Sequence, residues 1–224
     1  MRITLNAGCA RPNVLLTGFD AFGGLAANPS GASVQHLDGE TVAGHLIVGA
    51  CLPTSFTQAP LELARLVYRF DPALVICVGM AGGRQGFSME RVAINIDDAR
   101  IPDNLGRQPV DEPVVFGGPT AYFSTLPIKA MVRALLGAGI AAEVSQTAGT
   151  FVCNHVFYLL MHHLATHRPD GQSARGGFIH VPGCGSEGDA PILPINETIR
   201  GLRVALEGAL TTPVDCVISG GSIS

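Results

Sequence analysis

ALVICVGM, residues 73–80, is an almost unbroken apolar run, and the glycine-rich turn AGGRQG follows it at residues 81–86. A short apolar run without polar alternation predicts a strand that is buried on both faces, as in a parallel sheet covered by helices. Cys77 lies inside this run, where a buried free thiol is the usual role of a cysteine. The run therefore indicates an α/β fold.

Strand-like and helix-like segments alternate on both sides of this run. Apolar or alternating stretches predict further strands at 13–19, 45–52, 87–101, 141–149 and 176–183. Amphipathic patterns predict helices at 56–69, 126–139, 152–167 and 194–208. The segment Asn28-Pro29-Ser30 is typical of a helix start, with Asn28 or Ser30 near the cap. This alternation favours a single-domain three-layer α/β/α sandwich with a largely parallel twisted sheet.

The chain is expected to hold one domain with two short flanking segments. The domain should span residues 13–208, after an N-terminal extension at 1–12. Residues 209–224 are small and polar, and we expect this C-terminal tail to be poorly ordered. Within the domain, residues 102–120 are rich in Pro, Gly and Asp and predict a long loop. The helix at 56–69 is expected to bury an apolar stripe of Leu61, Leu63, Ala64, Val67 and Tyr68.

Composition and charge limit the partners and the compartment. Of 224 residues, 47% are hydrophobic and 14% charged, the net charge is −4, and Lys129 is the only lysine. Without a basic block, nucleic acid and anionic membranes are not expected as partners. The six cysteines form no CxxC pair, which argues against a zinc or thioredoxin-type site. No stretch is apolar and long enough for a signal peptide or a membrane span, so we expect a cytoplasmic protein.

Cys153 is a candidate nucleophile because of its place in the chain. It follows Thr147-Ala148-Gly149-Thr150 and opens the helix expected at 152–167. In a first helical turn, the dipole and the free backbone N–H groups favour a thiolate and could hold an oxyanion. The alternative is a buried cysteine on an amphipathic helix, which is the more common role.

A cysteine nucleophile needs a base, and His180 is the best placed of the seven histidines. It stands in FIHVP, at the carboxyl end of a predicted strand, where open α/β sheets present catalytic groups. A hydrogen-bonded core histidine is the alternative. His155 should point to nearly the opposite side of the helix from Cys153, and His163 and His167 have a metal-compatible spacing without the glutamate of a zinc peptidase helix.

Glu90 is the candidate third residue that orients the base. In the alternation of residues 87–101 it shares a face with Val92, Ile94 and Ile96, and a carboxylate on an apolar face needs a partner or a purpose. A buried ion pair with Arg91 or Arg100 is the alternative. The glycine-rich turn lacks the lysine and serine of a P-loop, and the adjacent Asp97 and Asp98 do not make a metal site.

Several long motifs resemble the pyroglutamyl-peptidase I family, also called pyrrolidone-carboxylate peptidase. The resemblance covers about residues 14–182. It rests on TGFDAFGGLAANPS (17–30), GMAGGRQGFSMERVAINIDDARIPDN (79–104), GGPTAYFSTLPIKAM (117–131), SQTAGTFVCNHVFY (145–158) and GGFIHVP (176–182).

The resemblance implies a catalytic triad and a pocket. The triad is Cys153, His180 and Glu90, and Arg100 is expected to hold the oxyanion beside the Cys153 backbone N–H. The implied walls of a pocket for the pyroglutamyl ring are Phe19, Phe22 and Phe151, with Asn28 as polar neighbour. The implied reaction removes an N-terminal pyroglutamyl residue from a peptide through a thioester acyl-enzyme, with no metal and no cofactor. Members are cytosolic and commonly tetrameric, so a homo-oligomer, tetramer or dimer, is expected.

The chain also departs from the family pattern. After Pro182 it continues GCGSEGDAPILP, where the family has a loop with tyrosine and glutamine, and Met80 stands where a glutamine is common. The loop 183–194 and Met80 therefore leave substrate detail and oligomeric state open. Two other hypotheses are a non-catalytic or altered-specificity relative that binds pyroglutamyl peptides, and a nucleoside phosphorylase on a similar scaffold, for which no phosphate site is apparent.

Overall fold

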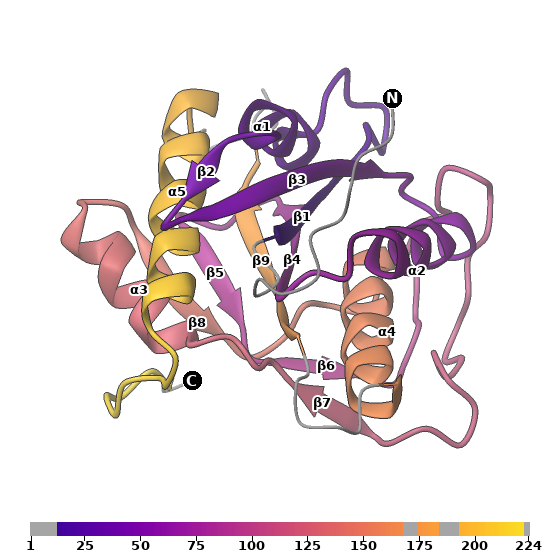
Figure 1. The fold of residues 1–224 in the computed structure, drawn as a ribbon. Coiled ribbons are helices and arrows are strands. Elements are labelled where there is room, and N and C mark those ends of the chain that lie inside the picture. Colours follow the sequence, from indigo (N-terminus) through magenta and orange to yellow (C-terminus); the bar gives the residue numbers. More distant parts are fainter. Residues whose placement is uncertain (1–12, 168–173, 184–192, 222–224) are drawn as a thin grey trace, which may run out of the picture.

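A seven-stranded sheet forms the centre of the computed structural model, which describes residues 13–167, 174–183 and 193–221. The strand order is β2-β3-β1-β4-β9-β5-β8 (Figure 1). Four neighbouring strands run parallel: β3 (His45–Leu52), β1 (Asn13–Phe19), β4 (Leu74–Ala81) and β9 (Arg175–Pro182). The edge strand β2 (Thr41–Val42) pairs antiparallel with β3. On the other side, β5 (Phe87–Glu90) runs antiparallel to β9 and parallel to β8 (Ala142–Ser145).

Strand β4 is the central strand that its apolar run predicts. Residues 74–79 are buried, and β1 and β9 pair with it on either side. A strand with helices on both faces must be apolar throughout, because neither face meets water. The prediction of a largely parallel sheet is confirmed.

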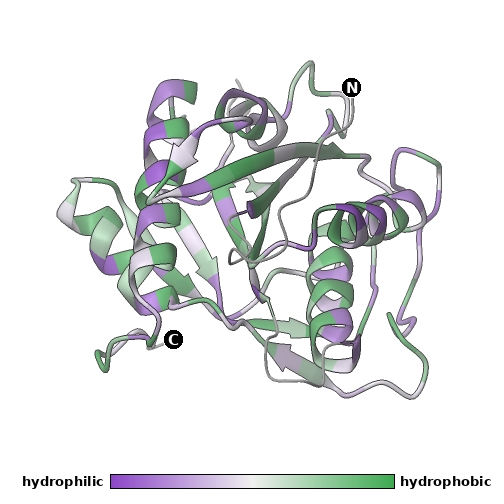
Figure 2. Cartoon of the chain, viewed as in Figure 1, coloured by the Kyte–Doolittle hydropathy of each residue, from purple (hydrophilic) through white to green (hydrophobic). Residues whose placement is uncertain are grey.

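Helices cover both faces of the sheet and complete three layers. One hydrophobic core lies between the sheet and α1 (Pro29–Leu37), α3 (Ile128–Gly137) and α5 (Ile195–Thr211). The other lies between the sheet and α2 (Gln58–Phe70) and α4 (Val152–His167). Figure 2 shows hydrophobic residues along β3, whereas α2 and α5 alternate between hydrophobic and hydrophilic residues, as expected for helices with one buried face. No helix of the described residues is long and apolar enough to cross a membrane.

The predicted strand at 87–101 is wrong in its extent. It divides into β5 in the main sheet and β6 (Val92–Ile94), which pairs with β7 (Ala121–Phe123) in a separate two-stranded sheet. Glu90 therefore does not share a strand face with the isoleucines that follow it. The apolar residues are odd-numbered up to Met89 and even-numbered from Val92, so the alternation changes phase at Glu90 and Arg91, where the chain leaves the main sheet.

Two further expectations differ from the structure. On α2, Leu61 and Tyr68 are 72% and 92% exposed and Ala64 is exposed as well. The buried residues of this helix are Ala59, Leu63, Leu66 and Val67. The described part of the expected loose tail contacts the body of the protein. Asp215 accepts hydrogen bonds from the backbone N–H groups of Lys129 and Ala130 at the start of α3, at 3.1 and 2.9 Å. The extension 1–12 and most of the loop 183–194 lie outside the described residues.

Candidate active site

Three strands and one helix bring the predicted triad together. His180, near the carboxyl end of β9, lies between Gly79 of β4 and Ser88 of β5 in the sheet register. Glu90 is the last residue of β5, two residues beyond Ser88. Cys153 is in the first turn of α4, the helix that packs on this face of the sheet. The site is therefore built at strand ends, as the sequence predicts for an open α/β sheet.

Cys153 lies directly over the strand next to His180. A Cβ atom added at Gly79 would be 2.9 Å from Cys153 Sγ, so the sulfur contacts the backbone of this glycine. Gly79 pairs with His180, and neighbouring strands are about 4.8 Å apart. The absence of a side chain at Gly79 thus gives the thiol its place beside the histidine.

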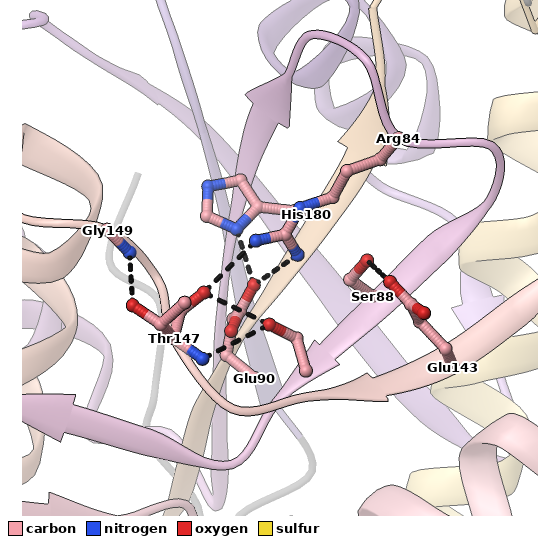
Figure 3. Close-up of polar contacts among 8 residues, drawn as sticks. Arg84, Ser88, Glu90, Glu143, Thr147, Gly149 and His180 are labelled. Atoms are coloured by element: carbon pink, nitrogen blue, oxygen red, sulfur yellow. Dashed lines mark hydrogen bonds and ion pairs between the residues drawn. The ribbon is translucent and has the colours of Figure 1, made fainter. Parts of the chain in front are cut away.

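His180 and Glu90 form a buried hydrogen-bonded pair. The distance from His180 Nδ1 to Glu90 Oε1 is 2.7 Å, and the two residues are 4% and 0% exposed (Figure 3). An ionised carboxylate can only accept, so Nδ1–H donates and Nε2 carries the lone pair of the neutral ring. This tautomer is the one that a general base needs.

Arg84 completes this cluster, and the sequence interpretation missed it. Its Nη1 donates to Glu90 Oε1 at 2.6 Å, and its Nη2 donates to the Thr147 carbonyl at 3.0 Å (Figure 3). The alternative to a role in orienting His180 was an ion pair of Glu90 with Arg91 or Arg100, but Arg91 donates to the Gly220 carbonyl at 3.0 Å. Arg84 could have been found from its place in the turn that connects β4 to β5, since that turn leads into the strand that ends in Glu90.

The electrostatics of the thiol differ from the expectation of a free thiolate. Burial raises the pKa of the Cys153 thiol to about 12, with smaller contributions from the charge of Glu90 and from Cys77, while Arg84 opposes them. Burial also lowers the pKa of His180, against the opposing effect of Glu90. The resting pair is therefore a neutral thiol beside a neutral imidazole, because burial outweighs the dipole of one helix end.

An aromatic cluster includes Phe151, which lies two residues before Cys153 in the sequence. The rings of Phe22 and Phe151 have centroids 5.1 Å apart, and Phe56 packs edge-on against Phe151 at 5.2 Å. Phe22 and Phe151 are partly exposed, so they can form a wall next to Cys153. Phe19, by contrast, is 2% exposed and packs on Phe178 in the core. Phe56 is the member of this cluster that the sequence interpretation did not name.

Asn28 has a clear role in the fold. As the cap of α1, its Oδ1 accepts from the Ser30 backbone N–H at 3.0 Å and from Ser30 Oγ at 2.8 Å. Its Nδ2 donates to the Asp20 carbonyl at 3.0 Å. These bonds fix the segment between β1 and α1 that carries Phe22, so Asn28 positions the aromatic wall whether or not it also binds a ligand.

Arg100 lies on an exposed segment that is tied to the start of α4. Asp98 N–H donates to the Thr150 carbonyl at 3.0 Å, and Thr150 Oγ1 donates to the Asp98 carbonyl at 2.7 Å. Arg100 itself is exposed and has no hydrogen bond or ion pair with the described residues. Its contact with an oxyanion stays a prediction. The hydrogen bonds between Asp98 and Thr150 fix the backbone of this segment near the start of α4.

The other histidines of α4 make separate contacts. His155 Nδ1 is 2.7 Å from Asp97 Oδ2, His162 Nδ1 is 2.8 Å from Tyr122 Oη, and the rings of His163 and His167 stack with centroids 4.5 Å apart. Across the described part of the chain, no group of three or more His, Cys, Asp or Glu side chains could hold a metal ion.

Comparisons with known proteins place the chain among pyroglutamyl peptidases. A family model described as pyroglutamyl peptidase matches residues 12–212. Pyrrolidone-carboxylate peptidase 1 of Ralstonia nicotianae is 52% identical over 217 residues, which cover 95% of this chain and 99% of that protein. The corresponding protein of Bacillus cytotoxicus is 46% identical over 213 residues, covering 93% and 98%.

Crystal structures show the same fold. Pyroglutamyl peptidase I from Bacillus amyloliquefaciens superposes with a TM-score of 0.89 at 43% identity, over 94% of this chain and all of that chain. A mutant pyrrolidone carboxyl peptidase from Pyrococcus furiosus gives a TM-score of 0.84 at 40% identity, over 89% and 98%. With these identities over nearly the whole length, the chain belongs to the pyroglutamyl peptidase family.

Proposed function

We propose that this enzyme removes N-terminal pyroglutamyl residues from peptides by cysteine catalysis, through a thioester acyl-enzyme. Family membership supports the substrate and the bond that is cleaved. The observation that supports the mechanism is the buried His180–Glu90 pair at 2.7 Å beside a strand position that Cys153 Sγ contacts. This is the arrangement of nucleophile, base and orienting carboxylate that covalent acyl transfer requires.

The reaction starts from neutral partners. As Cys153 Sγ attacks the pyroglutamyl carbonyl carbon, the thiol proton passes to His180 Nε2, and the carbonyl oxygen becomes an oxyanion. Glu90 then faces an imidazolium, which its carboxylate stabilises. The free N–H groups at the start of α4 and the guanidinium of Arg100 stabilise the oxyanion.

The intermediate then collapses in two stages. The C–N bond of the peptide breaks, His180 gives its proton to the leaving amine, and the pyroglutamyl thioester of Cys153 remains. Water attacks this thioester while His180 accepts its proton, and the C–S bond breaks to release pyroglutamate and the free thiol. Every proton taken by His180 is returned, so the cycle needs no further reactant.

The aromatic wall suits the proposed substrate. Phe22 and Phe151 offer apolar faces to an uncharged lactam ring, whose N–H and C=O need only a few placed polar partners. The roles of Phe19 and Asn28 in ring binding, the cytoplasmic location and the homo-oligomeric state stay predictions.

Trapping the acyl-enzyme tests this proposal. The enzyme is mixed with pyroglutamyl-aminomethylcoumarin, quenched in acid and digested with a protease. The mass of the peptide that contains Cys153 is then measured by mass spectrometry. A mass increase of one pyroglutamyl group on this peptide is expected, and prolyl-aminomethylcoumarin, which has a cationic amine in place of the lactam, should leave it unmodified. Release of coumarin with the modification on no cysteine would refute the thioester route.

A further inference from the structure

Arg84 makes both of its hydrogen bonds with the described residues inside the candidate site. One nitrogen donates to Glu90 Oε1 at 2.6 Å, the same oxygen that receives His180 Nδ1 at 2.7 Å. The other donates to the Thr147 carbonyl at 3.0 Å, in the segment that leads from β8 to α4. A single guanidinium therefore connects the orienting carboxylate with the chain just before the nucleophile (Figure 3).

The Thr147 segment is held by local bonds that extend this connection. Ser145 Oγ also donates to the Thr147 carbonyl at 3.0 Å, and Gly149 N–H donates to Thr147 Oγ1 at 3.0 Å. Ser145 pairs with Glu90 across β5 and β8. The position of the first turn of α4 and the position of the Glu90 carboxylate are thus fixed by the same small network.

Glu90 depends on this cation for its charge balance. Its side chain is 0% exposed, and its Oε2 has no hydrogen-bond partner among the residues that the structure describes. A buried carboxylate with one neutral histidine as donor is poorly compensated, whereas an arginine ion pair satisfies it. The Arg84 side chain is 23% exposed, so it closes the network from the solvent side.

We propose that Arg84 is a positioning residue of the triad: it holds the Glu90 carboxylate aligned, and so sets the orientation of His180 relative to Cys153. Arg84 has no hydrogen bond to the thiol or the imidazole, and it acts through its hydrogen bonds to Glu90 and the Thr147 carbonyl. This inference extends the proposed cysteine mechanism and rests on it.

The charges around the pair predict how Arg84 affects the pH profile. Among the described residues, the titratable and charged groups that act on His180 and Cys153 are Glu90 from β5, Arg84 from the β4–β5 turn and Cys77 from β4. Beyond them, Glu143 of β8 accepts from Ser88 Oγ at 3.1 Å. The charge of Arg84 lowers the pKa of both His180 and Cys153, so its removal raises both and moves the acid limb of the reaction to higher pH.

Arg84→Met and Arg84→Lys test the proposal by steady-state kinetics and by alkylation of Cys153 with iodoacetamide over a pH series. Arg84→Met should lower kcat by about 10- to 100-fold with KM changed less than about threefold, since charge-assisted bonds to the carboxylate are lost. Both acid limbs should shift to higher pH. Arg84→Lys, which keeps the charge but reaches one acceptor, should recover part of kcat and most of the pH profile.

Two matched comparisons distinguish positioning from general stability. Arg203→Met removes an exposed arginine that pairs with Glu40 at 2.7 Å on the other side of the sheet, and it should leave kcat and both profiles unchanged. When Arg84→Met is added to the Glu90→Gln variant, kcat should fall by less than a further factor of about three, because both residues act in one network.

Several results would overturn the inference: an Arg84→Met enzyme with wild-type kcat, profiles that superimpose on the wild type, or losses that add in full to those of Glu90→Gln. If Arg84→Met does not fold, the same three measurements on Arg84→Lys test the inference: kcat, the two pH profiles and additivity with Glu90→Gln. The alkylation profile needs no substrate, so it tests Arg84 even if the wild-type enzyme does not turn over a pyroglutamyl peptide, a result that would contradict only the proposed function.

Discussion

The part of the chain that the structure describes contains two buried histidine–carboxylate pairs that look alike and differ in their surroundings. His180 Nδ1 lies 2.7 Å from Glu90, and His155 Nδ1 lies 2.7 Å from Asp97. Both histidines and both carboxylates are at most 6% exposed. The His180 pair lies beside the Cys153 sulfur and carries the Arg84 cation, whereas His155 meets the edge of the Phe56 ring at 5.4 Å.

The difference teaches that such a pair is not a catalytic site by itself. His155 follows Cys153 by two residues on α4, so its side chain projects from another side of the helix and holds the segment of Asp97. The neighbours of each pair differ accordingly. A thiol and a cation beside His180 suit the proposed role of a base, whereas His155 joins α4 to the segment that carries Arg100.

The largest expected effect comes from changing the two carboxylates in parallel. Glu90→Gln should lower kcat by about 10²- to 10⁴-fold, because the amide neither holds the Nδ1–H tautomer nor stabilises the imidazolium. Asp97→Asn should change kcat by less than about threefold but lower the free energy of unfolding by about 1–3 kcal/mol, as a buried hydrogen-bond partner is impaired. Kinetics and urea unfolding of both variants measure this contrast.

Equal losses of turnover in the two variants would contradict the distinction between the His180–Glu90 pair and the His155–Asp97 pair. In that case the His155 pair would belong to the catalytic machinery as well. Unchanged turnover in Glu90→Gln would reduce Glu90 to a structural residue.

Gly79→Ala should have the next largest effect. The new Cβ would meet Phe178 Cζ at 2.8 Å and Cys153 Sγ at 2.9 Å, both closer than carbon and sulfur side chains allow, so the thiol must move away from His180. A fall in kcat of about 10- to 100-fold is expected from misplacing a reacting atom. Gly82→Ala is the control, since a Cβ there meets no atom within 4 Å. If Gly79→Ala retains wild-type kcat, the thiol does not work from this position.

The pH profile should show the smallest, most diagnostic effect. Because burial lowers the pKa of His180, its imidazole stays neutral at pH values somewhat below the ordinary pKa of histidine. The value of kcat/KM should therefore stay constant from about pH 8 to about pH 6.5 and fall at lower pH. The histidine of the unfolded chain is protonated at a higher pH than the buried His180 of the folded chain. The free energy of unfolding should therefore fall as the pH drops below the ordinary pKa of histidine. A thiol with a pKa of about 12 adds no limb near neutral pH. A flat profile down to about pH 5, or a rise centred near the ordinary cysteine value, would contradict this.

Most of the fold follows from local patterns, which explains what could be predicted. The strands β1, β3 and β9 are short apolar runs, and α4 is bounded as expected, because burial on a sheet imposes these patterns directly. The split of β5 from β6 was missed because the change of phase at Glu90 and Arg91 was not used as a break in the alternation. Leu61 and Tyr68 were misplaced because apolar residues on α2 occur on both of its faces.

The triad could be predicted, but its surroundings could not. Cys153 opens a predicted helix and His180 lies near the end of a predicted strand, where an α/β sheet presents functional groups. Glu90 was chosen as a carboxylate on an apolar strand face, and the structure places it at the end of β5 instead. The catalytic roles of all three stay predictions. The ion pair of Arg84 with Glu90 depends on how an exposed glycine-rich turn folds back over the strand end. The raised pKa of Cys153 depends on packing from several elements, which no single segment encodes.

The most direct test of the account is hydrolysis of pyroglutamyl-aminomethylcoumarin by the wild type and by Cys153→Ser, each with and without iodoacetamide. The account predicts turnover by the wild type that alkylation abolishes, and none above background by a folded Cys153→Ser enzyme. Cys77→Ser, which removes a fully buried thiol in β4, should remain active and alkylation-sensitive. Turnover that persists in Cys153→Ser would contradict the assignment of the nucleophile, and no turnover by a folded, reduced wild type would contradict the proposed activity.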